Sequence, residues 1–390
     1  MSCRMSLRNK RIAILNDSTK YGRLTIMQQP IVHTYSLGEL YTERKEKGDP
    51  SLPILTVSIH AGVSEGELDE DKLGKKVKRI ADKTQYKTAR KGDLVFNMMR
   101  AWQGAIGVVR SDGLVSPAYI VAKPNEKIWP EYMDYCMKTP RMIHAIHRQS
   151  YGVTDFRLRL YWDSFTPITC QLPTLPEQQK IAAILSTQDK VIELKEKLLA
   201  QKQQQKKYLM QQLLTGKKRL PGFDRKWNYV KANEIFKSIV DKSHDGKLEV
   251  LSSTQDKGIV PRSQVDIDIK YNENSLSTYK KVCEGDFVIS LRSFQGGIEY
   301  SNYAGIVSPA YTVLRAIVKI DNGYYKQFFK SSNYIKRLNV AVYGIRDGKQ
   351  ISYDDFGQIK IPVPPIEEQR EVAKVLSTAD HEIDLLQKSI

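Results

Sequence analysis

The chain has 390 residues, which is long enough for two domains that each bury a core of their own. Its formal net charge of +17 and pI near 9.4 favour a polyanionic partner, nucleic acid before membrane, over the alternative of a merely basic surface. The four cysteines are scattered without a Cys-x-x-Cys pair, which argues against a zinc site and a disulfide framework. The sequence shows neither a signal-peptide pattern nor an apolar run that could cross a bilayer, so we expect a cytoplasmic protein with no membrane partner.

Residues 1–34 are polar and basic and form a predicted N-terminal arm. Residues 35–172 change to short apolar runs separated by turn residues, as in Ile54–Val57 and Tyr119–Ala122. This pattern predicts a mostly antiparallel sheet domain. A helix is expected within it over Tyr132–His147, so the predicted fold class is α+β.

A long central helix is predicted next, over residues 173–218. Thr174 and Glu177 have the spacing of a capping box, and Gly216 supplies a stop. Such a long amphipathic helix cannot bury its apolar stripe alone, so it needs a partner helix.

The stripe of this helix keeps the alternating steps of three and four residues that are typical of a coiled-coil seam. The predicted seam is Ile184, Thr187, Val191, Leu194, Leu198, Gln201, Gln205, Tyr208 and Gln212. Because its middle is polar, the stretch Gln201–Lys206 is predicted to bury least and to tolerate an insertion best.

The beginning of the central helix recurs at the end of the chain. The segment Leu175–Asp189, LPEQQKIAAILSTQD, returns 191 residues later and without a gap as Ile366–Asp380, IEEQREVAKVLSTAD. Two amphipathic helices could share leucines by chance, but not Glu-Gln and Ser-Thr-x-Asp at fixed offsets. We therefore infer an internal duplication, in which residues 363–390 form a distal helix that partners the central one.

Residues 219–362 repeat the globular pattern as a second domain. The matching segments are Lys91–Phe96 with Glu284–Ile289, Arg100–Gly104 with Arg292–Gly296, Val115–Tyr119 with Val307–Tyr311, and Tyr151–Val153 with Tyr343–Ile345. With the order globule, helix, globule, helix, a distal helix that pairs with the central one must run antiparallel to it, which gives a pseudo-two-fold repeat. The central helix is roughly 57 Å long and the distal one roughly 35 Å, so the pair is partial or the chain is truncated.

At this point the chain resembles the specificity subunit of type I restriction–modification enzymes, the HsdS family, over residues 35–390. The LPEQQKIAAILS helix and its second copy match that family's two conserved regions. The pair GDLVFNMMRAWQG and GDFVISLRSFQG, together with the two VSPAY segments, is typical of its two target recognition domains. One departure is the Arg219–Phe223 segment, RLPGF, which has no counterpart before the first globule.

The resemblance implies a non-catalytic scaffold. Each target recognition domain would read one half of an asymmetric bipartite site on double-stranded DNA, and the paired helices would fix the gap between the halves. The helices would also hold two adenine-N6 methyltransferase (modification) subunits, and motor-nuclease (restriction) subunits would join that core. No cofactor is expected on this chain itself, because AdoMet, ATP and Mg would bind the partner subunits.

The sequence itself provides no catalytic or metal-ligating set. It has no Gly-x-x-x-x-Gly-Lys-Ser/Thr loop for phosphate and no Asn/Asp-Pro-Pro-Tyr/Phe motif of the kind that amino-methyltransferases use on a flipped base. Glu193 and Lys195 mimic half of a nuclease motif, but charged residues are expected there on a coiled-coil surface. The rival hypothesis, a self-contained DNA-modifying or cleaving enzyme with fused recognition domains, would need a block of sequence that the two domains do not leave free.

Candidate DNA contacts occur at corresponding places in both globules. Arginine can bind guanine bidentately and glutamine can read adenine in the major groove. A shared motif supplies Arg100, Trp102 and Gln103 in the first globule and Arg292, Phe294 and Gln295 in the second. The alternative, which we favour, is that this motif is a structural turn, since residues that read different half-sites should differ. The divergent loops are better candidates, with Tyr151, Thr154, Arg157 and Arg159 in the first globule and Tyr343, Arg346, Lys349 and Gln350 in the second.

Two polar triplets lie inside the helices, although their residue types are poor helix formers. They are Ser186, Thr187 and Asp189 in the central helix and Ser377, Thr378 and Asp380 in the distal one. We interpret them either as a contact surface for the methyltransferase subunits or, with slight preference, as hydrogen bonds between the paired helices. The basic linker Lys217, Lys218 and Arg219 either touches DNA phosphate or stays in solvent.

Overall fold

The computed structural model describes residues 32–59, 62–65, 82–154, 157–265, 273–291, 293–341 and 351–390. The chain divides into two compact units, Met1–Lys190 and Val191–Ile390, and the 39-residue helix α7 (Leu175–Leu213) runs through the division. Most of the predicted arm 1–34 lies outside the described residues. The predicted domain boundaries stay a prediction, because this division cuts the central helix rather than its ends.

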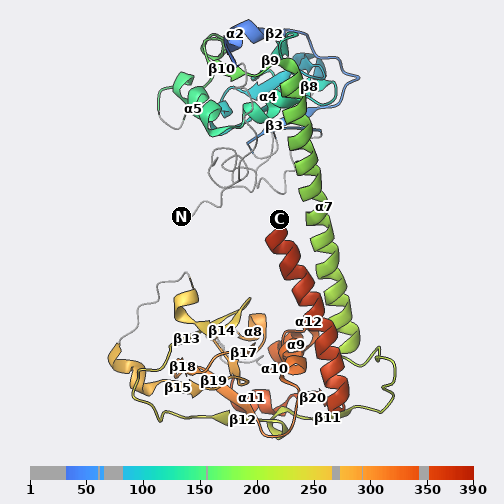
Figure 1. The fold of residues 1–390 in the computed structure, drawn as a ribbon, viewed down its shortest axis with the longest axis vertical. Coiled ribbons are helices and arrows are strands. Elements are labelled where there is room, and N and C mark those ends of the chain that lie inside the picture. The colour runs from blue at the N-terminus through green and yellow to red at the C-terminus, as the bar shows by residue number, and fades with distance from the viewer. Residues whose placement is uncertain are drawn as a thin grey trace, which may run out of the picture. The chain divides into compact units, whose positions relative to one another are not determined.

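The first unit (Figure 1) contains an antiparallel four-stranded sheet with the strand order β2-β9-β6-β7 and three two-stranded pairs, β1-β10, β3-β4 and β5-β8. Its strands are β1 (His33–Ser36), β2 (Tyr41–Glu43), β3 (Leu55–Ser58), β4 (Gly62–Glu65), β5 (Lys87–Ala89), β6 (Leu94–Asn97), β7 (Ile106–Val108), β8 (Gly113–Val115), β9 (Tyr119–Pro124) and β10 (Thr169–Leu172). Its helices before α7 are α2 (Leu37–Leu40), α4 (Pro130–Cys136), α5 (Pro140–Gln149) and α6 (Trp162–Phe165), with 3₁₀ turns η2 (Lys83–Gln85) and η3 (Ala101–Gln103).

The helix predicted over Tyr132–His147 is two helices, α4 and α5, so that expectation was wrong. Pro140 has no N–H and disfavours a helical conformation in the residue before it. Thr139 is accordingly extended, and its hydroxyl accepts the N–H of Met142 at 3.3 Å to cap α5.

The second unit repeats this topology, with a four-stranded antiparallel sheet in the order β12-β19-β16-β17 and the pairs β11-β20, β13-β14 and β15-β18. Its strands are β11 (Asn228–Lys231), β12 (Phe236–Ile239), β13 (Leu251–Thr254), β14 (Gly258–Pro261), β15 (Lys280–Val282), β16 (Phe287–Ile289), β17 (Glu299–Tyr300), β18 (Gly305–Val307), β19 (Thr312–Ala316) and β20 (Lys360–Val363). Its helices are α8 (Ser293–Gly296), α9 (Asn322–Phe329), α10 (Ser332–Ala341), α11 (Tyr353–Gln358) and α12 (Ile366–Ser389), with 3₁₀ turns η4 (Ala232–Glu234), η5 (Arg262–Gln264) and η6 (Glu273–Thr278). Each strand pairing of the first unit has its counterpart here, which confirms the predicted α+β class and the internal repeat.

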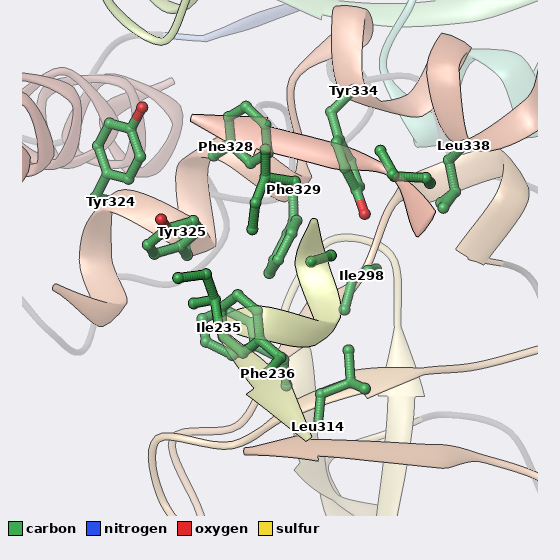
Figure 2. Close-up of a cluster of buried hydrophobic side chains, with 14 of the residues drawn as sticks. Ile235, Phe236, Ile298, Leu314, Tyr324, Tyr325, Phe328, Phe329, Tyr334 and Leu338 are labelled. Carbon is green, nitrogen blue, oxygen red and sulfur yellow. The ribbon is translucent and has the colours of Figure 1, made fainter. Parts of the chain in front are cut away.

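The core of the second unit is aromatic (Figure 2). Phe236 lies at its centre, with its ring centroid 5.3 Å from that of Tyr325 and 5.4 Å from that of Phe329. The last turn of α7 and the first turns of α12 enter the same cluster through Leu213 and Leu376. Both helices are therefore anchored by burial in this core, where each large apolar side chain contributes about 1.5–3 kcal/mol.

The distal helix α12 lies beside the C-terminal half of α7 and runs antiparallel to it, as predicted (Figure 1). Lys195 donates to the carbonyl of Ser389 at 2.8 Å, and Lys202 pairs with Glu382 at 2.7 Å. Lys206 pairs with Asp380. In these three contacts the residue numbers increase along α7 while those of their partners decrease along α12, so the two helices run antiparallel.

The predicted seam of α7 is wrong by one residue. Of the predicted seam residues, Val191, Leu194 and Leu198 are 38, 52 and 41% exposed. The face toward α12 instead contains lysines, Lys195 among them, whose stems lie against the partner helix while their ammonium groups reach its polar atoms. A pattern of apolar letters cannot detect a seam made partly of lysine stems, so it selected the adjacent, exposed stripe.

Both copies of the repeat tie a helix to its globule through one buried glutamine. The amide of Gln178 donates to the carbonyls of Pro173 and Lys127 at 3.0 and 3.1 Å and accepts the N–H of Trp129 at 2.9 Å. Gln369 repeats this arrangement within the second unit, donating to the carbonyl of Pro364 and accepting the N–H of Asp321. The glutamine of the recurrent Glu-Gln pair is thus a structural link in each copy.

Candidate nucleic-acid interface

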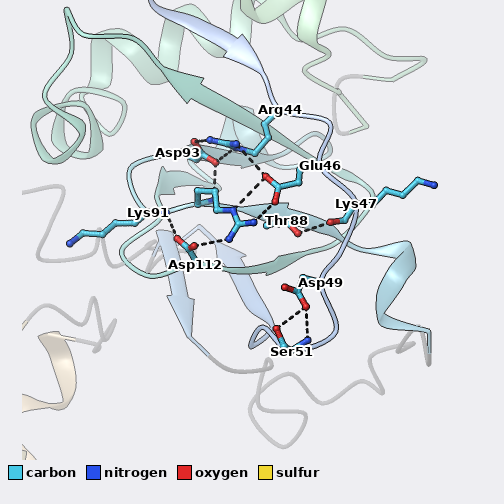
Figure 3. A network of polar contacts seen from close by, with 10 residues as sticks. Arg44, Glu46, Lys47, Asp49, Ser51, Thr88, Lys91, Asp93 and Asp112 are labelled. Atoms are coloured by element: carbon cyan, nitrogen blue, oxygen red, sulfur yellow. Dashed lines mark hydrogen bonds and ion pairs between the residues drawn. The ribbon is translucent and has the colours of Figure 1, made fainter.

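The Gly-Asp motif, Gly92-Asp93 in the first unit and Gly285-Asp286 in the second, is a structural turn in both units. In the first, Arg44 makes two hydrogen bonds to the buried carboxylate of Asp93, with its Nε 2.6 Å from one oxygen and its Nη2 3.1 Å from the other (Figure 3). In the second, Arg315 makes the same fork to Asp286 at 2.8 and 2.7 Å. These bonds raise the pKa of Arg44 and Arg315 from the ordinary value. The motif therefore fixes the framework of the sheet.

The two arginines come from different strands. Arg44 follows β2, whereas Arg315 lies on β19, the counterpart of β9. Since β2 pairs with β9 and β12 with β19, the guanidinium reaches the same aspartate from the neighbouring strand. Both units keep the arginine–aspartate fork although the arginine stands at different sequence positions, so we infer that the fold requires the fork.

The repeated VSPAY segments are also turns. The Ser116 hydroxyl accepts the N–H of Ala118 at 3.3 Å, and the Ser308 hydroxyl accepts that of Ala310 at the same distance. A partly buried lysine holds each turn. Lys87 donates to the carbonyl of Tyr119 in the first unit, and Lys280 donates to that of Tyr311 in the second. Burial lowers the pKa of Lys87. These segments are framework rather than readers.

The first group of predicted DNA contacts lies at the end of β6, around η3. Arg100 and Gln103 are exposed, whereas Trp102 is partly buried. Its indole donates to the carbonyl of Met99 at 3.2 Å, and its ring centroid lies 5.6 Å from that of His147 on α5. Trp102 thus holds η3 on α5, and Arg100 and Gln103 remain available to a ligand.

The second predicted group forms the loop after α5. Tyr151 is 58% exposed, exchanges backbone hydrogen bonds with Arg159, and stacks on Tyr161 at a centroid distance of 5.1 Å. Arg157 and Arg159 are exposed and Thr154 is partly buried.

One backbone hydrogen bond joins the two groups. The N–H of Leu160, in the loop after α5, donates to the carbonyl of Met98, just before η3, at 2.9 Å. The structure therefore brings η3 and this loop together at one end of the first unit's sheet.

Sequence reasoning missed part of this surface. Arg141, His144 and Arg148 are exposed on α5, at spacings of three and four residues that place them on one helix face. That spacing was a usable signal once α5 was separated from α4. With Arg100, Arg157 and Arg159 they make the neighbourhood cationic, as a surface that meets phosphate requires.

In the second unit, Arg292, Tyr343, Arg346, Lys349 and Gln350 lie outside the described residues, as does the side chain of Phe294. Gln295 is described and is exposed on α8. Helix α8 packs on α10, as η3 packs on α5.

The exposed residues differ between these matched helices. His147 and Arg148 of α5 correspond to Asn339 and Val340 of α10, and Val340 is 72% exposed. Both units thus share the packing of these elements, whereas the exposed side chains at matched positions differ in charge and polarity.

The polar triplets of the helices have two roles. Ser186 and Thr187 donate to the carbonyl of Ala183, and their counterparts Ser377 and Thr378 donate to that of Lys374, all within their own helix. The aspartates reach further.

Asp189 accepts the hydroxyl of Tyr135 at 2.9 Å, and Asp380 accepts the amide of Gln327 at 2.6 Å in addition to its pair with Lys206. Asp380 therefore does join the paired helices, while the exposed hydroxyls do not. A role of any of the six in partner binding stays a prediction.

The three residues of the basic linker also have different surroundings. Arg219 makes a bidentate ion pair with buried Glu368 at 2.5 and 2.7 Å and lies over the ring of Trp227, so it is part of the framework. Lys217 and Lys218 are exposed, and the ammonium of Lys218 lies 5.7 Å from the ring centroid of Tyr208.

Within the residues that the structure describes, no group of three or more His, Cys, Asp or Glu side chains could hold a metal ion. In the same residues, no helix is long and apolar enough to cross a membrane. The exposed cationic surfaces are thus the features of the described chain that point to a ligand.

Comparison with known proteins finds one family model twice in the chain. Residues 37–203 and 224–390 each match the family model of the type I restriction modification DNA specificity domain. A Methanocaldococcus jannaschii protein described as the specificity subunit of the type I restriction enzyme MjaX is 24% identical over 386 residues, which cover 89% of this chain and 84% of that protein.

Two solved structures share the fold. The HsdS subunit from Thermoanaerobacter tengcongensis has a TM-score of 0.53 at 21% identity, covering 93% of this chain and 92% of that chain. The S subunit of a type I restriction–modification system from M. genitalium has a TM-score of 0.52 at 13% identity, covering 94% of each chain. At these identities the likeness shows the fold alone.

Proposed function

The chain belongs to the type I restriction modification DNA specificity family, and we propose that it directs a methyltransferase and endonuclease complex to an asymmetric, bipartite DNA site. It is a specificity subunit with two tandem target recognition domains. In the proposal, each domain reads one half of the site on double-stranded DNA, and the helix pair sets the gap between the halves.

One observation carries this proposal, namely that a common framework presents different exposed residues in the two units. The Gly-Asp and VSPAY turns have the same geometry in both copies. At the matched helix position, however, Arg148 stands in one unit and Val340 in the other. Two readers that share a framework and differ in their exposed residues are what an asymmetric target needs, because base edges are distinguished by individual side chains.

The proposed protein partners are two adenine-N6 methyltransferase (modification) subunits and the motor-nuclease (restriction) subunits. Support comes from the exposed stripe on α7, where Val191, Leu194 and Leu198 lie beside the face that meets α12 and are 38, 52 and 41% exposed. Leu385, the counterpart of Leu194 on α12, is 53% exposed. Exposed leucines at matched positions of a repeat fit a surface that binds two copies of one partner.

Catalysis is assigned to those partners. The sequence lacks the phosphate-binding loop and the methyltransferase motif, and the two recognition domains leave no block for a further enzyme domain. AdoMet, ATP and Mg accordingly belong to the partner subunits, and the chain acts with them in the cytoplasm.

A domain exchange tests the proposal. Residues 224–360 are replaced by the same block of a relative, and the chain is expressed with its modification subunits. The methylated sequence, determined genome-wide, is expected to change in its second half and to keep its first half and its activity. A change in both halves would contradict independent reading, and methylation unaffected by the exchange would contradict the assigned role.

A further inference from the structure

A lysine reaches the same β-hairpin in both units. Lys330, directly after α9, donates to the carbonyl of Gln255 at 3.2 Å, at the tip of the β13–β14 hairpin. Lys138, its counterpart after α4, lies against Gly62 of the β3–β4 hairpin, so close that a Cβ built on Gly62 would be 3.0 Å from its Nζ. Gly62 and Gly258 open the second strand of their hairpins with positive φ, 66° and 76°.

In each unit a carboxylate pairs with this lysine, but the two units take that carboxylate from different elements. Lys138 pairs at 2.8 Å with Asp134 of α4, whereas Lys330 pairs with Glu299 of β17. Gly107, opposite Val95 in the sheet, occupies the Glu299 position in the first unit. A Cβ on Gly107 would lie 3.1 Å from the Asp134 carboxylate, so both carboxylates fill the same space.

Stability does not explain this partly buried ion pair. Glu299 is 2% exposed, and its Oε2 is buried without a hydrogen-bond partner in the described structure. Desolvation of a buried ion pair offsets most of its attraction, and apolar residues would serve a core at least as well. A lysine kept in both copies, with its partner taken from two different elements, indicates that the position of the lysine beside the hairpin is what matters.

The hairpin tip of the second unit adjoins its candidate interface. Gln255, Asp256 and Lys257 are all exposed. The side chain of Gln255 lies over α8, because a Cβ built on Gly296 would be 2.9 Å from its Cγ. The tip therefore lies beside Gln295, the exposed candidate DNA contact that directly precedes Gly296 in the chain.

We propose that the tip Gln255–Lys257 is a specificity-determining element of the second recognition domain, and that Lys330 is the positioning residue that holds it against α8. This rests on the proposed function. Gln255 presents an amide that can pair with the major-groove edge of adenine, and Lys257 presents a charge for phosphate or guanine. Lys330 bonds the backbone of the tip, so its effect on DNA passes through Gln255.

The test uses the full chain assembled with its modification subunits, with methylated sites sequenced as the readout. Q255A is expected to relax the base preference at one position of the second half-site by about tenfold, while the first half-site stays unchanged. K319A is the control, because exposed Lys319 follows β19 at the end of the sheet opposite α8, and it should leave every preference unchanged. Gln255 is exposed, so its replacement does not threaten folding.

The positioning role has its own variants. K330M is expected to relax the same base position as Q255A, and K330R, which keeps the charge and the donor, is expected to restore it. If K330M lowers the denaturation midpoint but leaves the base preference intact, Lys330 has a structural role only and the positioning role is wrong. If Q255A leaves all preferences unchanged while the wild-type complex methylates a bipartite site, the tip proposal is overturned and the proposed function stands. If the wild-type complex methylates no specific site, the proposed function itself fails.

Discussion

Glu177 and Glu368 occupy the same position in the two copies of the repeat, yet their carboxylates have different roles. Glu177 is exposed and accepts the N–H and hydroxyl of Thr174 at 3.0 and 2.7 Å, so it caps α7, and these bonds lower its pKa. Glu368 is buried and accepts two bonds from Arg219 and one from the indole of Trp227 at 2.8 Å. The RLPGF segment, which has no counterpart before the first globule, is thus explained by the partner that it provides for Glu368.

These roles predict unequal effects on stability. E368A should lower the free energy of unfolding by about 3 kcal/mol, because it leaves the Arg219 guanidinium and the Trp227 N–H without their acceptor. E177A should have a clearly smaller effect, because water can replace an exposed cap. Urea denaturation of both variants, with E371A at an exposed position of α12 as the control, measures the difference. Equal losses in the two variants would contradict the assignment.

The amino-acid sequence predicted the repeat, but it could not predict that Glu177 and Glu368 differ in burial and in role. Matched letters at fixed offsets sufficed for the order of elements, the antiparallel helix pair and the structural character of the Gly-Asp motif. Whether Glu368 is buried depends on Arg219, 149 residues away in sequence, and so on packing that a local pattern does not contain.

The candidate interface was predicted in part for the same reason. Thr154 and Arg159 could be proposed as contacts because the residues at the matching positions of the second copy, Arg346 and Ile351, differ from them. The cationic face of α5 was hidden by the expectation of one helix, and the hairpin tip at Gln255 is adjacent to α8 only through tertiary contact.

The cysteines give a test of the core of the first unit. Burial raises the pKa of the Cys136 thiol to about 11 and that of Cys170 to about 12, whereas Cys283 is exposed. In a C3S background at pH 8, an aromatic disulfide reagent should modify Cys283 rapidly. Cys136 and Cys170 should react at least a hundredfold more slowly, since fewer thiolates form and access is restricted. Rapid reaction of three thiols in the native protein would be incompatible with the described packing, and denaturant should expose all of them.

The charge of the first interface predicts the salt dependence of DNA binding. The double variant R157A/R159A should bind the cognate DNA more weakly, and the slope of log K against log salt should fall in magnitude by about two if both arginines meet phosphate. K91A/K123A removes two exposed charges at the opposite end of the same sheet and is the matched control. Identical slopes for the two double variants would place the DNA elsewhere on this unit.

The last prediction concerns α7 as the element that sets the spacing of the half-sites. The sequence favours its polar middle, Gln201–Lys206, for an insertion, but in the structure Lys202 and Lys206 bind α12 there. An insertion directly after Lys190 avoids this face, because it lies beyond the Asp189 bond to Tyr135 and precedes Lys195, which binds the end of α12.

Four inserted helical residues add about 6 Å and rotate the downstream part of the helix by about 40° beyond a full turn. At about 3.4 Å per base pair, the gap between the half-sites should widen by one or two base pairs while both half-site sequences stay the same. A four-residue insertion within Gln201–Lys206 is the comparison, and it should reduce methylation because the ion pairs with α12 lose their register. If the insertion after Lys190 returns the original gap with full activity, the bound modification subunits, and not α7, set the distance. The recognised bases and the distance between them are obtained from the same methylated sites, so loss of recognition is distinguished from a change of spacing.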